Sequence, residues 1–239
     1  MPWRSYSLSS NCIVLGRSYK ATPTTVYKQI YLASQSPRRQ ELLKQLGVSY
    51  ELLLPDPSED AESLESLIPG ERAQDYVMRV TQLKLDAAIQ RQAQRKLPDL
   101  PILCADTTVA LLAEDMAAPH DLILGKADDA AHAQQILELL SGRTHWVYTA
   151  MALGTSSQRA LQVSASQVTF MDLSHAHIKA YLASGEYVGK AGAYGIQGLA
   201  GSFVTEIKGS YSGIMGLCVH QSAQLLDHFK VSYALRQYG

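Results

Sequence analysis

The chain has 239 residues and a formal net charge of −1, with 46% hydrophobic and 18% charged residues. This composition is typical of a globular protein that can bury a sizeable core, and it excludes the basic excess that general binding to nucleic acid or membrane surfaces needs. No apolar run approaches the roughly 20 residues that span a bilayer, and three scattered cysteines without CxxC spacing argue against a disulfide framework or a zinc knuckle.

The first 28 residues differ from the rest of the chain in charge. They contain Arg4, Arg17, Lys20 and Lys28 and no acidic residue. This bias resembles a transit peptide, while a disordered extension or a start codon called too far upstream explains it equally well. We therefore set residues 1–28 apart as an N-terminal extension and expect a single domain over residues 29–239.

The domain begins with a short apolar run, residues 30–33, that predicts a buried strand. A polar turn follows, and an amphipathic helix is expected from Pro37, because proline suits the first helical position and Ser36 can cap it. Arg38 and Arg39 lie at the positive end of this helix, where an anionic ligand would remove the charge conflict. The alternative is an ordinary helix start with two solvated arginines.

Apolar runs and amphipathic stretches alternate along the remaining chain. Strands are predicted over 48–54, 101–105, 109–112, 145–153, 161–170 and 204–207. Helices are predicted over 70–96, 128–140, 174–184 and 217–229, the second capped by Asp128. Because the strands 145–153 and 161–170 are expected to form a hairpin, the pattern predicts an α/β fold with a mixed rather than a purely parallel sheet.

Asp106 directly follows the predicted strand 101–105, at the place where α/β folds present catalytic groups. The alternative for Asp106 is a structural carboxylate that begins a turn. Lys84, Lys126 and Lys190 lie beside apolar or glycine-rich sequence rather than in charge runs. Each alone fits an exposed lysine whose stem lies on apolar surface, but together with the two arginines they could neutralise a polyphosphate.

Residues 189–203 form a glycine-rich segment that contains Gln197. Its glycines resemble a dinucleotide-binding fingerprint only superficially, because a strand follows where that motif needs a helix. Glycines that allow close approach, beside a side-chain amide, suit recognition of a planar polar group such as a nucleobase. A turn that needs positive φ is the alternative.

Four segments, in order, closely resemble the Maf family of nucleoside triphosphate pyrophosphatases. They are LASQSPRRQELLKQLGV (32–48), CADTTVALL (104–112), ILGKADDA (123–130) and GKAGAYGIQGLAGSFVTEIKGSY (189–211). The resemblance implies a Maf or ITPase-like α/β fold, with a mixed twisted sheet, flanking helices and two lobes around a central cleft. It also implies hydrolysis of a nucleoside triphosphate to the monophosphate and pyrophosphate, with a divalent cation, Mg²⁺ or Mn²⁺, as cofactor.

Within the family the chain looks like the branch that acts on dTTP and UTP. The resemblance gives each candidate a role. Asp106 is the catalytic proton acceptor, Arg38, Thr107 and Gln197 select the pyrimidine, Ser34, Arg39, Lys84, Lys126 and Lys190 hold phosphate, and Glu59 is the candidate metal ligand.

The chain departs from the family pattern at Leu83 and Gly189, where acidic residues are usual, and at Ala127, where proline is usual. We expect a cytoplasmic, homodimeric enzyme that removes surplus or modified pyrimidine triphosphates and binds neither nucleic acid nor membrane. A nucleotide-binding regulator of cell division and septum formation, with weak or no catalysis, is the alternative. A purine-directed enzyme on the same fold is a third hypothesis.

Overall fold

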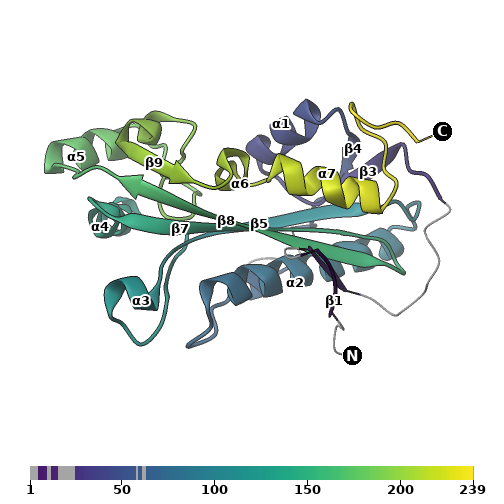
Figure 1. The fold of residues 1–239 in the computed structure, drawn as a ribbon, viewed down its shortest axis with the longest axis horizontal. Helices are drawn as coiled ribbons and strands as arrows, with labels where there is room; N and C mark the ends of the chain where they lie inside the picture. Colours follow the sequence, from purple (N-terminus) through teal and green to yellow (C-terminus); the bar gives the residue numbers. More distant parts are fainter. Residues whose placement is uncertain (1–4, 10–11, 16–24, 58, 61–62, 239) are drawn as a thin grey trace.

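The computed structural model describes residues 5–9, 12–15, 25–57, 59–60 and 63–238, the first two ranges as backbone only. One mixed sheet runs through the molecule, with helices on both faces (Figure 1). Its strands are β1 Ser5–Ser9, β2 Cys12–Leu15, β3 Gln29–Leu32, β4 Ser49–Leu52, β5 Ile102–Leu111, β6 Leu122–Leu124, β7 Thr144–Gly154, β8 Arg159–Phe170 and β9 Val204–Lys208.

The helices are mostly short and flank the long strands. They are α1 Pro37–Gln45, α2 Ala73–Gln94, α3 Ala113–Met116, α4 Ala130–Leu140, α5 His175–Ala183, α6 Tyr211–Met215 and α7 Val219–His228, with 3-10 turns η1 Ser63–Glu65 and η2 Leu199–Phe203. Among the described residues no helix combines the length and apolar character needed to cross a membrane.

The strand order is β1-β2-β8-β7-β5-β3-β4, with β6 added to β5 and β9 to β8. β3 runs parallel to both β4 and β5, whereas the other pairs are antiparallel. The expected mixed α/β sheet is therefore confirmed. The predicted hairpin is also confirmed, because β7 pairs with β8 along its whole length.

Three groups of helices cover this sheet (Figure 1). One group is α2, and the other two, α1 with α7 and α4 with α5, define the two lobes. α2 packs on one face, against even-numbered residues of β5 such as Ile102 and Cys104. Odd-numbered residues point to the opposite face, because side chains alternate along a strand. There Leu103 and Ala105 join a core with α1 and α7, while Val109 joins a separate core with α4 and α5. The two lobes thus meet near position 107.

Two helix starts show how well local signals predicted the elements. α1 begins at Pro37, and the Ser36 hydroxyl caps it by accepting from the Arg39 amide, as expected. The cap of α4 is Asp129, one residue later than expected, because its carboxylate accepts from the His132 amide at 2.7 Å.

β5 corrects the prediction that residues 106–108 interrupt a strand. It is continuous over ten residues, because β7 pairs with nearly its whole length. On the other edge, β3 pairs only with Ile102 and Leu103, and β6 only with Val109–Leu111. Between these neighbours one edge of β5 has no paired strand among the described residues, and Asp106 lies in that gap.

Parts of the N-terminal extension lie outside the described residues, namely 1–4, 10–11 and 16–24. The remaining parts include β1 and β2, which pair with each other, and β2 also pairs with β8. The three interpretations of residues 1–28, a transit peptide, a disordered extension or a start codon called too far upstream, stay predictions. The domain boundary between residues 28 and 29 stays a prediction.

Candidate active site

A cavity of about 750 Å³ opens at the unpaired edge of β5, between the two lobes. Its walls come from the first turn of α1, one side of α2, the middle of β5, the end of β6, and the glycine-rich segment. Nine of the ten predicted site residues line it: Ser34, Arg38, Arg39, Lys84, Asp106, Thr107, Lys126, Lys190 and Gln197. The fold brings together residues that are up to 163 positions apart in the chain.

The cavity is strongly positive although the whole chain carries a net charge of −1. Its lining includes six cationic and two acidic side chains, which leaves four positive charges in excess. The cationic residues are Arg38, Arg39, Lys84, Arg91, Lys126 and Lys190, and the acidic residues are Glu65 and Asp106. A concave site with this charge focuses a positive potential on its contents and favours a polyanionic ligand.

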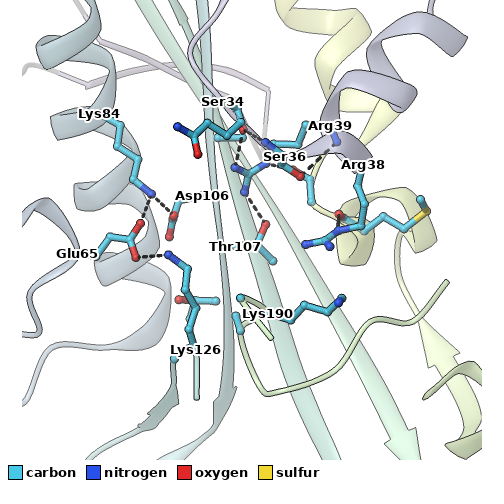
Figure 2. Close-up of a pocket in the computed structure, with 18 of the residues that line it drawn as sticks. Ser34, Ser36, Arg38, Arg39, Glu65, Lys84, Asp106, Thr107, Lys126 and Lys190 are labelled. Carbon is cyan, nitrogen blue, oxygen red and sulfur yellow. Dashed lines mark hydrogen bonds and ion pairs between the residues drawn. The ribbon is translucent and has the colours of Figure 1, made fainter. Parts of the chain in front are cut away.

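Asp106 belongs to a chain of ion pairs on the α2 side of β5 (Figure 2). Lys84 Nζ lies 2.5 Å from Asp106 Oδ1 and 2.7 Å from Glu65 Oε1. The other Glu65 oxygen accepts from Lys126 Nζ at 2.9 Å. Burial alone would raise the pKa of Glu65, but the charges and hydrogen bonds of the two lysines outweigh it and hold the pKa below its ordinary value.

Arg39 lies on the opposite side of β5 and is held by three protein acceptors (Figure 2). Its Nε donates to the Gly216 carbonyl at 2.9 Å, Nη1 to Ser34 Oγ at 3.3 Å, and Nη2 to Thr107 Oγ1 at 3.2 Å. Desolvation lowers the pKa of the Arg39 guanidinium, and the nearby Asp106 carboxylate opposes that shift. Arg39 is therefore a fixed charge at the α1 start that faces the cavity.

Arg38 and Lys190 approach the cavity from different lobes. Arg38 Nε donates to the Met215 carbonyl at 3.3 Å, and Lys190 Nζ donates to the Glu186 carbonyl. Desolvation and the positive charge of Arg38 both lower the pKa of Lys190, against a smaller opposing effect of Glu186. An anion bound between the two groups would offset the repulsion that lowers the pKa of Lys190.

The glycine-rich segment is tied to β6 at its start and to the sheet further on. Lys126 and Ala191 form an isolated antiparallel bridge, and the Gly192 amide donates to the carbonyls of residues 124 and 125. Gly192 has φ +67°, and a β-carbon there would lie 2.8 Å from Val109 Cγ2. Glycine at 192 therefore allows the close approach that sets Lys126 beside the segment that carries Lys190 and Gln197.

A buried histidine, His145, contacts the glycine-rich segment through Tyr194. His145 Nε2 lies 2.8 Å from the Tyr194 hydroxyl, and both residues pack against Phe170. Burial lowers the pKa of His145 to about 3, so the ring is neutral at ordinary pH. His145 Nδ1 has no hydrogen-bond partner within the described residues.

Glu59 is the predicted site residue that the structure does not bring to the cavity lining. Its carboxylate pairs with Arg91 Nη2 at 2.6 Å, and this pairing lowers the pKa of Glu59 to about 2. The carboxylate in the cavity is Glu65, six residues later in the same acidic loop. The sequence showed that the loop is acidic but not which member turns inward, because that depends on contacts with Lys84 and Lys126.

The described residues contain no group of three or more His, Cys, Asp or Glu side chains arranged to hold a metal ion. They do bring two carboxylates, Glu65 and Asp106, to the same ammonium group of Lys84. Mg²⁺ is commonly bound by one or two carboxylates together with substrate phosphates. The donor set therefore fits a divalent cation that arrives with a phosphorylated ligand.

Comparison with known proteins defines the class to which this fold and cavity belong. The family model for Maf-like protein matches residues 29–229, and the chain belongs to the Maf family. Two similar relatives are dTTP/UTP pyrophosphatases. That of Albidiferax ferrireducens is 55% identical over 200 residues, covering 84% of this chain and 96% of the relative. That of Cupriavidus metallidurans is 56% identical over 197 residues, covering 82% and 94%.

The comparison with solved structures matches the nucleoside-triphosphatase / dITP/XTP pyrophosphatase of Mycobacterium abscessus. The aligned region covers 61% of this chain and 75% of the Mycobacterium abscessus chain, with 19% sequence identity and a TM-score of 0.38. This likeness is too weak to support an argument about the present site.

Proposed function

We propose that this protein is a nucleoside triphosphate pyrophosphatase that hydrolyses dTTP, UTP and modified pyrimidine triphosphates to the monophosphate and pyrophosphate. The carrying observation is the placement of Asp106 in the gap along β5, facing a cavity with four excess positive charges. A triphosphate supplies the polyanion that this cavity favours, and a carboxylate beside it can accept a proton from water. The names of the two relatives support the substrate class.

In this proposal Asp106 orients and deprotonates the water that attacks the α-phosphorus. Of the two carboxylate oxygens of Asp106, only Oδ1 contacts Lys84. Within the described structure, Oδ2 is therefore available to the water. The contact with Lys84 fixes the direction of the carboxylate. Arg39, Lys126 and Lys190 stabilise the negative charge on the phosphate oxygens.

Glu65 and Asp106 are the residues that would hold a divalent cation, together with phosphate oxygens of the substrate. Such a cation supplies charge neutralisation on the phosphates. Lys84 forms an ion pair with each of the two carboxylates and so neutralises part of their charge before substrate enters. Glu65, rather than Glu59, is thus the metal-ligand candidate of this proposal, because Glu59 lies outside the cavity lining and its carboxylate is paired with Arg91.

Pyrimidine selection is proposed for Arg38, Thr107 and Gln197, which all line the cavity. The first two lie on the α1 side of β5, while Gln197 is exposed on the glycine-rich segment across the cavity. A base held between them would place its triphosphate towards the lysines. Ser34 helps indirectly, since its hydroxyl accepts from Arg39 and from the Ser36 amide.

The test is pyrophosphate release from a triphosphate panel with Mg²⁺ or Mn²⁺, using wild-type protein and Asp106→Asn. The substitution keeps the size of the side chain but removes its basicity, so release should fall about 10²–10⁴-fold while nucleotide binding is retained. Asp86→Asn is the matched control, because Asp86 pairs with Arg159 and lies outside the cavity lining. Activity that survives Asp106→Asn would show that another group accepts the proton.

The remaining expectations concern the setting of the enzyme. We propose a cytoplasmic homodimer that acts in nucleotide-pool maintenance, without nucleic-acid or membrane partners. The alternative of a division regulator drew on Leu83 and Gly189. Leu83 is exposed on α2 and lies outside the cavity lining, so its position gives no structural reason for a lost catalytic function. Gly189 lines the cavity, with open space where a side chain would lie.

A further inference from the structure

A row of hydrogen bonds leads from the cavity into the core through two threonines. Thr107 on β5 and Thr149 on β7 are register partners, and their hydroxyl oxygens lie 2.9 Å apart. On the inner side, Thr149 Oγ1 lies 2.7 Å from the Gly213 carbonyl oxygen. On the outer side, Arg39 Nη2 lies 3.2 Å from Thr107 Oγ1. Thr149 is completely buried, whereas Thr107 is partly exposed and lines the cavity.

The two ends of this row determine where each hydrogen lies. A carbonyl oxygen carries no hydrogen, so the close approach at Gly213 requires the Thr149 hydroxyl to donate. A hydroxyl has one hydrogen, so Thr149 can only accept from Thr107. The Thr107 hydroxyl therefore donates inward. On its other side it accepts from Arg39, because a guanidinium is a donor only.

The reverse order of donors is unfavourable. It would bring the Thr149 and Gly213 oxygens to 2.7 Å without a hydrogen between them, in a place closed to water. Two oxygens that face each other with lone pairs alone at this distance repel one another. The Thr107 oxygen therefore has its hydrogen committed to the core, and it can offer only a lone pair to the cavity.

An oxygen restricted in this way discriminates between ring nitrogens. Uracil and thymine carry a hydrogen on N3, which can donate to the Thr107 lone pair. Cytosine has a lone pair at the same position, which would face the Thr107 lone pair. Phosphate oxygens are also acceptors, so the same argument assigns Thr107 to the base and not to the triphosphate.

We infer that Thr149 is a specificity-determining residue that acts through Thr107: by accepting the Thr107 hydrogen, it makes Thr107 an acceptor that selects bases with a ring N–H, uracil and thymine, over cytosine. This inference rests on the proposed function, and it adds the physical origin of the pyrimidine choice. Thr149 itself does not line the cavity and acts only through its hydrogen bond with Thr107, so it is a positioning residue.

The test compares kcat/KM for UTP and CTP in Thr149→Val and Thr149→Ser. Valine has the shape of threonine without the hydroxyl, so Thr107 becomes free to turn its hydrogen into the cavity and accommodate cytosine. The Gly213 carbonyl keeps its bond from the Gly216 amide at 2.9 Å, so the valine variant leaves no orphaned carbonyl. We expect the UTP-to-CTP ratio to fall about tenfold in Thr149→Val, the scale of one misdirected hydrogen bond, and to stay near wild type in Thr149→Ser.

Two further variants separate this effect from loss of a buried hydroxyl in general. Thr81→Val removes another fully buried threonine hydroxyl, which bonds the Val77 carbonyl and lies outside the cavity lining, so it should leave the ratio unchanged. In a Thr107→Val background, Thr149→Val should have no further effect on the ratio, because the hydroxyl through which Thr149 acts is gone.

The outcomes distinguish this inference from the proposed function. If wild-type protein releases no pyrophosphate from UTP or dTTP, the proposed function fails and the inference falls with it. If wild type is active and folded Thr149→Val keeps the wild-type ratio, or loses activity on UTP and CTP equally, the inference alone is wrong. If wild-type activity on CTP is below detection, detectable CTP hydrolysis by Thr149→Val supports the inference, and its absence with UTP activity retained overturns it.

Discussion

The close contact between Gly192 and β5 gives a sharp test of how the glycine-rich segment is positioned. In Gly192→Ala the residue must keep φ +67°, which costs an L-residue about 1–2 kcal/mol. Its β-carbon would also lie 2.8–2.9 Å from three side-chain atoms of Val109, and overpacking of this kind costs a further 1–3 kcal/mol or so. We therefore expect unfolding free energy to fall by about 2–5 kcal/mol.

Gly189→Ala is the matched control, because Gly189 has a nearly identical φ of +68° but open space around the missing side chain. It should cost only the backbone contribution of about 1–2 kcal/mol. Urea denaturation of both variants measures the difference, and the KM for UTP should rise more in Gly192→Ala as Lys190 and Gln197 shift. Equal destabilisation of the two variants would refute the steric contact as the device that holds the segment.

Two further predictions concern charge. Lys84→Met leaves two carboxylates without their shared cation, so it should destabilise the protein by about 1–3 kcal/mol at neutral pH, more than Lys126→Met, whose ammonium is more exposed and pairs with Glu65 alone. The folded-state pKa of Glu65 is lowered. The charged Glu65 therefore stabilises the protein above its ordinary pKa, and this contribution is lost as pH falls through the lowered value. Unfolding free energy measured against pH should show a smaller loss in Lys84→Met than in wild type. The pKa of His145, about 3, lies below its ordinary value, so between these two values the unfolded chain binds a proton that the folded protein does not. Unfolding free energy should therefore decline as pH falls from about 6.5 towards 3. His145→Gln should remove this pH dependence, and an unchanged pH dependence in that variant would refute the prediction.

Local sequence patterns were enough for most elements of the fold. Ser36 and Pro37 predicted the start of α1, and long β-branched runs predicted the β7–β8 hairpin, because capping and alternation act over a few residues. The polar residues after Ala105 misled the prediction, since a strand that pairs with β7 along its length tolerates a carboxylate where its other edge is open. Pairing between distant segments cannot be read from local pattern.

The site shows the same division. Ten candidate residues were named from sequence and motif resemblance, and nine of them line the cavity. Glu65 was missed in favour of Glu59, because both lie in one acidic loop and only the positions of Arg91 and Lys84 distinguish them. Thr149 carried no signal, since a threonine in a β-branched strand is unremarkable until its partners across the sheet are known.

The sequence by itself determined which chemical groups are available and where helices and strands begin, because caps, periodicity and turn residues are local properties. It also carried the family, through motifs that keep their order along the chain. Only the tertiary structure decided which acidic residue enters the cavity, why Asp106 lies at an open strand edge, and in which direction the Thr107 hydroxyl donates. Those properties depend on distances between residues far apart in the chain, and packing alone sets them.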